Sequence, residues 1–208
     1  PDPAQGPGAG GKGLMATGLI SRLGDAAPSG LAGDLAIPDC APGIGDVISK
    51  IDSPHLIEGV RIEGVDLWPD DRGYFLEVMR SGCGLVQDFN SGELQVSAAL
   101  SYPGTIKAFH YHQLQSDCWT VAVGSLQVVL VDLRRGSTTY ARKNTIYVGA
   151  ARPWQMLIPP GVAHGYKVIG TEAALMVYST DRVYNPLDEG RIAYNDGQIA
   201  YDWETQHK

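Results

Sequence analysis

Short segments with the apolar pattern of β-strands follow one another from His55 onward, at intervals of about ten residues. Turns rich in glycine and proline separate them, among them residues 69–73, 103–104 and 159–161. No long stretch repeats its apolar residues with the period of a helix. About ten short strands with turn signals between them predict an all-β sandwich or barrel.

We expect strands at residues 60–68, 74–79, 94–102, 106–112, 121–123, 126–133, 145–148, 155–158, 164–169 and 173–179. Residues 81–92 are expected to hold a loop or a small helix. In the tail, Asp188-Glu189-Gly190 is expected to begin a helix or a turn, with a short strand after it.

Residues 1–54 differ in composition from the rest of the chain. They contain 11 of the 26 glycines and 7 of the 13 prolines, and no aromatic residue. A segment with so little apolar surface to bury does not offset the entropy lost on ordering, so we expect a flexible leader. Within it, Ile44 to Ile51 is expected to form a short helix or a packed arm. The predicted organisation is a leader or arm over residues 1–54 and one domain over residues 55–208.

The charge and the cysteines limit the class of protein. A formal net charge of -7 and a pI near 5.1 argue against binding to duplex nucleic acid or to an anionic membrane. No apolar stretch reaches the length of a membrane-spanning helix. The three cysteines are an odd number without CxxC spacing, which favours reduced thiols and a cytoplasmic protein.

Two histidine motifs carry the candidate chemistry. The first runs from Gly104 through His110, His112 and Asp117 to Gly124, and the second runs from Pro159 to His164. Alternate residues of a strand face the same side, so the imidazoles of His110 and His112 are expected on one wall. Three histidines and one carboxylate can hold one divalent metal ion inside a small barrel. A single histidine in a strand, in contrast, is more often a hydrogen-bonded core residue.

These motifs resemble the two-part signature of the cupin superfamily, and a longer ordered set of residues is more specific. The set comprises residues 71–77 (DRGYFLE), Gln95, residues 131–134 (VDLR), Ser137, Thr139, residues 158–166 (IPPGVAHGY), Tyr178, residues 184–186 (YNP), Glu189 and residues 195–196 (ND). Over roughly residues 58–203, the chain resembles the nucleotide-sugar 3,5-epimerases similar to dTDP-4-dehydrorhamnose 3,5-epimerase. The resemblance implies a double-stranded β-helix, also called a jelly roll, that forms homodimers and needs no cofactor.

The resemblance also implies a reaction and its residues. The substrate would be a nucleotide-diphosphate sugar with a 4-keto-6-deoxy ring, used in polysaccharide biosynthesis. His110 would be the base that removes a proton beside the ketone, and Tyr178 the acid that returns one to the opposite face. Contacts to the substrate would come from Arg72, Glu77, Gln95, Lys107, His112 and His164. Arg72 and Glu77 are expected to reach the pocket of a partner subunit.

Asp117 stands where the family carries a lysine, and no residue matches the family's C-terminal aspartate that orients the base. We therefore expect Asp117 either to orient His110 or to bind metal. Two alternatives remain open. The first is a metal-dependent cupin that uses His110, His112, Asp117 and His164. The second is a sugar-nucleotide-binding protein that has lost catalysis.

Overall fold

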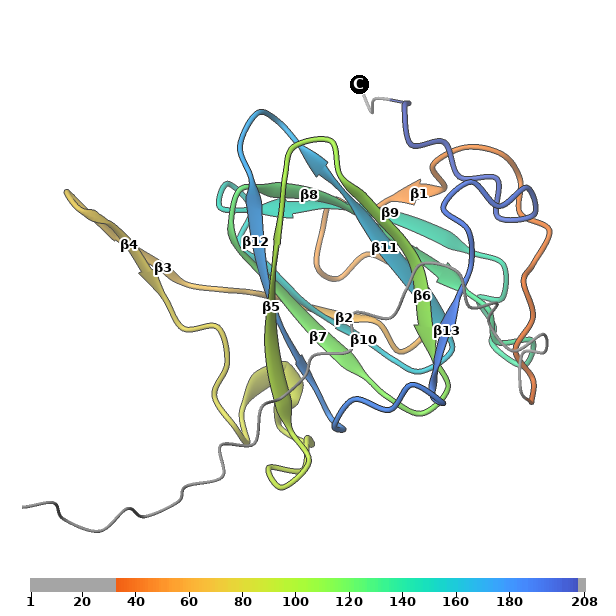
Figure 1. Ribbon diagram of the computed structural model, residues 1–208, viewed down its shortest axis with the longest axis horizontal. Coiled ribbons are helices and arrows are strands. Elements are labelled where there is room, and N and C mark those ends of the chain that lie inside the picture. The colour runs from red at the N-terminus through yellow and green to blue at the C-terminus, as the bar shows by residue number, and fades with distance from the viewer. Residues whose placement is uncertain (1–32, 206–208) are drawn as a thin grey trace, which may run out of the picture.

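The computed structural model describes residues 33–205, and these form a sandwich of two β-sheets with a projecting hairpin (Figure 1). One sheet has the order β1 (Asp46–Val47), β9 (Lys143–Gly149), β8 (Ser125–Asp132), β11 (Val162–Ile169), β6 (Ile106–His112) and β13 (Glu189–Arg191). The other has the order β2 (Arg61–Gly64), β10 (Trp154–Ile158), β7 (Asp117–Val123), β12 (Ala174–Thr180) and β5 (Gln95–Ser101). The hairpin consists of β3 (Leu67–Asp70) and β4 (Gly73–Leu76), and one short 3₁₀-helix, η1 (Gly84–Val86), follows it.

The fold is therefore the predicted double-stranded β-helix, and most expected strands lie within a few residues of the observed ones. The strand expected at residues 106–112 matches β6. Among residues 33–205, no helix is long and apolar enough to cross a membrane.

The main core fills the space between the two sheets. Leu126, Val128 and Leu130 alternate along β8 and are completely buried against inward side chains of the other sheet, such as Met156. Val129 and Val131 point to the other side of β8, where a second apolar cluster with residues of the tail covers them. Burial on both faces explains why β8 is an almost unbroken apolar run in the sequence.

The described part of the expected flexible leader packs on this outer face. Strand β1 pairs in parallel with β9. Ile37 and Ile44 pack against the second apolar cluster, whereas Ile48 joins the main core and has no exposed surface. The Nζ of Lys143 donates hydrogen bonds to the carbonyls of Ala41 and Gly43 at 2.7 and 2.9 Å. The expectation of flexibility is wrong for residues 33–54, because their few apolar side chains pack against the second apolar cluster and, at Ile48, in the main core. The arm expected at residues 44–51 is present and contains a strand instead of a helix, whereas residues 1–32 lie outside the described residues.

Two further segments differ from the sequence-based expectation. The turn expected at residues 69–73 is partly strand, because β3 extends through Pro69 to Asp70 and pairs with β4. The hairpin projects from the sandwich (Figure 1). Its side chains Trp68 and Phe75 are exposed. In the tail, the expected turn is confirmed at Asp188, but Glu189 and Gly190 already belong to strand β13, which pairs with β6.

Candidate active site

A cavity of about 250 Å³ lies between the two sheets. Its lining residues are Gln95, Ala99, Lys107, His110, His112, Gln115, Asp117, Trp119, His164, Tyr166, Met176, Tyr178, Thr180, Tyr184 and Glu189. Strands β6, β11 and β13 of one sheet supply the histidines, Lys107 and Glu189. Strands β5, β7 and β12 of the other sheet supply Gln95, Asp117 and Tyr178, respectively. The cavity is thus enclosed by side chains of both histidine motifs, as the sequence predicts.

A β-bulge in β6 places both Lys107 and His110 on the cavity wall. In a regular strand, residues three positions apart would face opposite sides. Here His110 pairs with His164 and Lys107 pairs with Tyr166, so β6 has one residue more than β11 across this interval. The extra residue lies close to Gly165, where a Cβ atom would come within 2.4 Å of the Cβ of Ala108. Gly165 therefore permits the close approach that the bulge requires.

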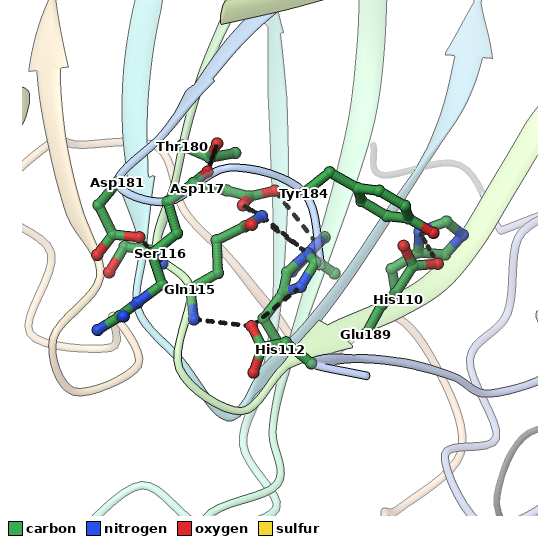
Figure 2. Close-up of polar contacts among 12 residues, drawn as sticks. His110, His112, Gln115, Ser116, Asp117, Thr180, Asp181, Tyr184 and Glu189 are labelled. Carbon is green, nitrogen blue, oxygen red and sulfur yellow. Dashed lines mark hydrogen bonds and ion pairs between the residues drawn. The ribbon is translucent and has the colours of Figure 1, made fainter. Parts of the chain in front are cut away.

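His110 lies beside a carboxylate from the tail. The Nδ1 of His110 is 3.6 Å from Oε1 of Glu189, and the Nε of Arg191 donates a 2.7 Å hydrogen bond to the same oxygen. Figure 2 shows His110 and Glu189 together, apart from His112, Gln115 and Asp117. Burial lowers the pKa of His110, and the Glu189 carboxylate opposes this effect in part. The ring is thus favoured in its neutral form, in which one nitrogen can accept a proton.

Asp117 lies between the other two histidines. Its Oδ1 is 3.8 Å from Nε2 of His112, and its Oδ2 is 3.6 Å from Nε2 of His164. The carboxylate also accepts hydrogen bonds from Nε2 of Gln115 at 2.8 Å and Nε1 of Trp119 at 3.2 Å. Burial lowers the pKa of His164 to about 4, although the charge of Asp117 opposes the shift.

Asp188 holds the loop between β6 and β7 against the cavity. Its Oδ1 accepts hydrogen bonds from the backbone N–H groups of Gln113 and Leu114, at 3.1 and 2.8 Å, and its Oδ2 accepts one from Gln115 at 3.1 Å. The same Oδ2 is 3.7 Å from Nδ1 of His112. One carboxylate thus orders the loop and lies beside a histidine of the cavity.

Tyr178 belongs to the wall opposite His110. It lies in β12, where it pairs with Trp119 of β7 and Ser97 of β5. Trp119 contacts the ring of His164 edge to face, with centroids 5.1 Å apart. Gln95 lies near the rim of this wall, where its Oε1 accepts a 2.9 Å hydrogen bond from the backbone of Tyr184.

Most predicted site residues line the cavity, and two do not. Arg72 lies at the tip of the β3–β4 hairpin, exposed and paired with Asp70, and Glu77 is paired with Arg80. Neither residue lines the cavity of its own chain. Among the described residues, no hydrogen bond or ion pair joins Asp117 to His110, and the carboxylate beside His110 belongs to Glu189.

The four-ligand metal set expected from the sequence reduces to three residues. His112, Asp117 and His164 offer ligand atoms that all lie within 4.8 Å of one another, and His110 does not belong to this group. Sequence reasoning did not assign Glu189, Asp188 and Gln115 to the site. The acidic pair Asp188-Glu189 was visible in the sequence, but its pairing with β6 depends on the tertiary fold.

Comparisons with known proteins agree with this architecture. The family model described as dTDP-4-dehydrorhamnose 3,5-epimerase matches residues 54–208. The spore coat polysaccharide biosynthesis protein SpsL of Bacillus subtilis is 42% identical over 155 residues, which is 74% of this chain and 100% of SpsL. The dTDP-4-dehydrorhamnose 3,5-epimerase of Pseudomonas aeruginosa is 33% identical over 144 residues, covering 66% of this chain and 77% of that protein.

Comparison with a solved structure points to the same family. The crystal structure of dTDP-6-deoxy-D-glucose-3,5-epimerase from Legionella pneumophila, in complex with dTDP-4-keto-L-rhamnose, superimposes with a TM-score of 0.64 at 28% identity. The match covers 76% of this chain and 84% of that one. This chain therefore belongs to the dTDP-4-dehydrorhamnose 3,5-epimerase family.

Proposed function

We propose that this protein is an isomerase that epimerises a dTDP-linked 4-keto-6-deoxy sugar at a carbon beside the ketone. The observation that carries the proposal is the placement of His110 and Tyr178 in the two opposing sheets, with both side chains lining one cavity. Inversion at a carbon requires removal of a proton from one face and its return to the other. A base and an acid on opposite walls meet this requirement.

His110 is the base in this proposal. Its Nδ1 faces Glu189, which leaves Nε2 free to accept the proton from the sugar carbon. The carboxylate of Glu189 also stabilises the imidazolium that forms, because an opposite charge nearby favours the protonated ring. Arg191 holds Glu189 in place through its 2.7 Å hydrogen bond. In this proposal Glu189, instead of Asp117, orients the base.

The enolate needs positive charge or hydrogen-bond donors near the carbonyl oxygen. Lys107 lines the cavity beyond the bulge in β6, near the ring of Tyr166, with 5.9 Å from Nζ to the ring centroid. We assign it to the stabilisation of the enolate oxygen or of the adjoining phosphate. Tyr178 then donates its phenolic proton to the carbanion carbon from the opposite wall. Tyr178 regains a proton from solvent and His110 releases its proton to solvent, so both residues return to their starting forms.

The reaction leaves the oxidation state of the sugar unchanged, so it needs no redox cofactor. We propose that side chains alone stabilise the enolate, without an organic cofactor or a metal. A cavity of about 250 Å³ is smaller than most sites that enclose a whole ligand, so the nucleotide extends from the sugar towards the rim. Gln95, His112 and His164 are proposed to contact the substrate. Arg72 and Glu77, on and beside the projecting hairpin, are proposed to reach the substrate in the partner of a cytoplasmic homodimer.

The proposal is tested by incubating the protein with a dTDP-linked 4-keto-6-deoxyglucose and following the sugar protons by NMR. Formation of an epimer at C3, at C5 or at both is the expected result. Sedimentation of the same sample measures the assembly, for which a dimer is expected. Tight binding of the substrate without any epimer would contradict the proposal and favour a sugar-nucleotide-binding protein.

A further inference from the structure

Two hydrogen-bond acceptors at the buried end of the cavity face each other without a donor between them. The Oδ2 of Asp117 and the Nε2 of His164 are 3.6 Å apart, and both residues line the cavity. The Nδ1 of His164 lies 3.0 Å from the carbonyl of Val162. Because a carbonyl only accepts hydrogen bonds, Nδ1 carries the proton, and the lone pair of the neutral ring is on Nε2. The nitrogen and the carboxylate oxygen therefore both present lone pairs to the gap between them.

A second pair of acceptors on the same carboxylate is bridged by a nitrogen. The Oδ1 of Asp117 is 3.8 Å from Nε2 of His112, and Nε2 of Gln115 donates to these two atoms at 2.8 and 3.3 Å. Figure 2 shows His112, Gln115 and Asp117 gathered at this end of the site. One NH₂ group thus satisfies two acceptors, because it has a hydrogen for each. In the described part of the chain no hydrogen bond reaches Nε2 of His164, so the first pair lacks such a bridge.

The charge at this end of the cavity is also uncompensated. The side chain of Asp117 is only 6% exposed, and it accepts hydrogen bonds from the neutral groups of Gln115 and Trp119. No lysine or arginine of the described residues forms an ion pair with it. Buried charges in proteins are usually paired with an opposite charge. A ligand group with at least two N–H donors and a positive charge would meet both needs.

We propose that the substrate sugar carries a primary amino group, whose N–H groups donate to Oδ2 of Asp117 and Nε2 of His164. A nitrogen about 2.8 Å from each acceptor fits a gap of 3.6 Å. A hydroxyl group in the same place has one hydrogen, so it would satisfy one acceptor and turn its own lone pairs towards the other. This inference rests on the proposed function, because it names a substituent of the sugar that the epimerase would bind.

The chemistry of the sugar and the charges of the cavity restrict the position of the amino group. In a nucleotide-linked 4-keto-6-deoxy sugar, C1 carries the phosphate, C4 the ketone and C5 the methyl group, so C2 and C3 are the carbons that remain. Lys107 lies near the beginning of β6, and His112, which faces Asp117, lies at its end. Opposite charges therefore mark the two ends of this wall. They suit a substrate with a phosphate at one end and an amine at the other.

The test is the affinity of the full chain for three dTDP-linked 6-deoxy sugars that have a hydroxyl group in place of the ketone, so that they bind without reacting. One carries hydroxyl groups at C2 and C3, and in each of the other two an amino group replaces one of these hydroxyls. Calorimetric titration at pH 7 is expected to show about 10- to 100-fold tighter binding of one amino sugar than of the hydroxyl sugar. Comparable or weaker binding of both amino sugars would overturn the proposal.

Asp117→Asn tests whether the acceptor pair causes the preference. The amide keeps the shape of the side chain and lacks its charge, so the preference for the amino sugar is expected to disappear. Asp66→Asn is the control, because it removes the same charge from an exposed residue that does not line the cavity. Thermal unfolding shows whether each variant folds. An unchanged preference in folded Asp117→Asn, or a lost preference in Asp66→Asn, would overturn the assignment.

Affinity and turnover separate this inference from the proposed reaction, because the affinities do not depend on proton transfer. A preference for an amino sugar without epimerisation of any 4-keto sugar would support the amino-group site and contradict the proposed function. Epimerisation of the 4-keto sugar with hydroxyl groups at C2 and C3, with no preference for either amino sugar, would support the proposed function and overturn this inference.

Discussion

The carboxylate of Glu189 lies 3.6 Å from Nδ1 of His110, although the two residues are far apart in the sequence. They meet because β13 pairs antiparallel with β6, which places Glu189 opposite His112 and Arg191 opposite His110. Arg191 fixes the carboxylate with a hydrogen bond of 2.7 Å. The base of the proposed reaction thus has a charged partner within its own chain.

Replacing this partner is expected to slow the reaction without preventing substrate binding. Glu189→Gln should lower kcat by about 10- to 100-fold and change KM much less, because the base loses its orientation and the imidazolium loses its counter-charge. Since Glu189 raises the pKa of His110, the acidic limb of the kcat/KM profile should move to lower pH in the variant. Glu204→Gln, at an exposed glutamate paired with Lys167, is the control. Wild-type kinetics in Glu189→Gln would contradict the assigned role.

Tyr178→Phe is expected to separate the two proton transfers. His110 can still remove a proton from the sugar and return deuterium from solvent to the same face. Net inversion should fall by about 100-fold or more, because the acid on the opposite wall is absent. NMR in deuterated water measures both rates on one sample. Inversion that remains as fast as in the wild type would exclude Tyr178 as the acid.

Gly165→Ala is expected to disturb the bulge in β6. The new Cβ would come within 2.4 Å of the Cβ of Ala108, so the two strands must separate. We expect the free energy of unfolding to fall by about 1–3 kcal/mol, with a loss of activity as Lys107 and His110 move apart. Gly197→Ala is the matched control, because no atom lies within 4 Å of the added Cβ. Urea unfolding of both variants makes the comparison, and equal stabilities would contradict this account of the bulge.

A buried carboxylate is expected to make stability depend on pH. Burial alone would raise the pKa of Asp132, but hydrogen bonds from Arg134, Ser137 and Thr139 outweigh it and lower the pKa. Because the pKa of Asp132 is lower in the folded state, its contribution to stability is complete above the pKa of the unfolded state, near 3.9. The contribution is lost as the pH falls through the pKa of the folded state. Asp132→Asn should lower the free energy of unfolding by about 1.5–3 kcal/mol at pH 7 and reduce its decline below pH 4.

Urea unfolding at a series of pH values tests this expectation. Asp66→Asn is the control, because it removes an acidic residue outside this hydrogen-bonded cluster. The same acid-dependent decline in Asp132→Asn as in the wild type would contradict the role of Asp132.

Local sequence patterns predicted the sandwich and the cavity wall, because both features depend on the alternation of side chains along single strands. β6 was predicted with its observed ends, and His110, His112 and His164 lie in the cavity as expected. The bulge was not predicted, because it depends on the register between β6 and β11. The position of Glu189 also depends on strand pairing. The packing of residues 33–54 was missed because composition does not reveal the second apolar cluster that receives Ile37 and Ile44, or the place of Ile48 in the main core.

Exchange of solvent deuterium into the sugar is the most direct test of the central claim. The protein is incubated in deuterated water with a dTDP-linked 4-keto-6-deoxy sugar, and deuterium at the carbons beside the ketone is followed by NMR. The wild type is expected to incorporate deuterium at C3, at C5 or at both, whereas His110→Ala should bind the substrate and incorporate none above the uncatalysed rate. Equal incorporation by His110→Ala and the wild type would contradict the assignment of His110 as the base.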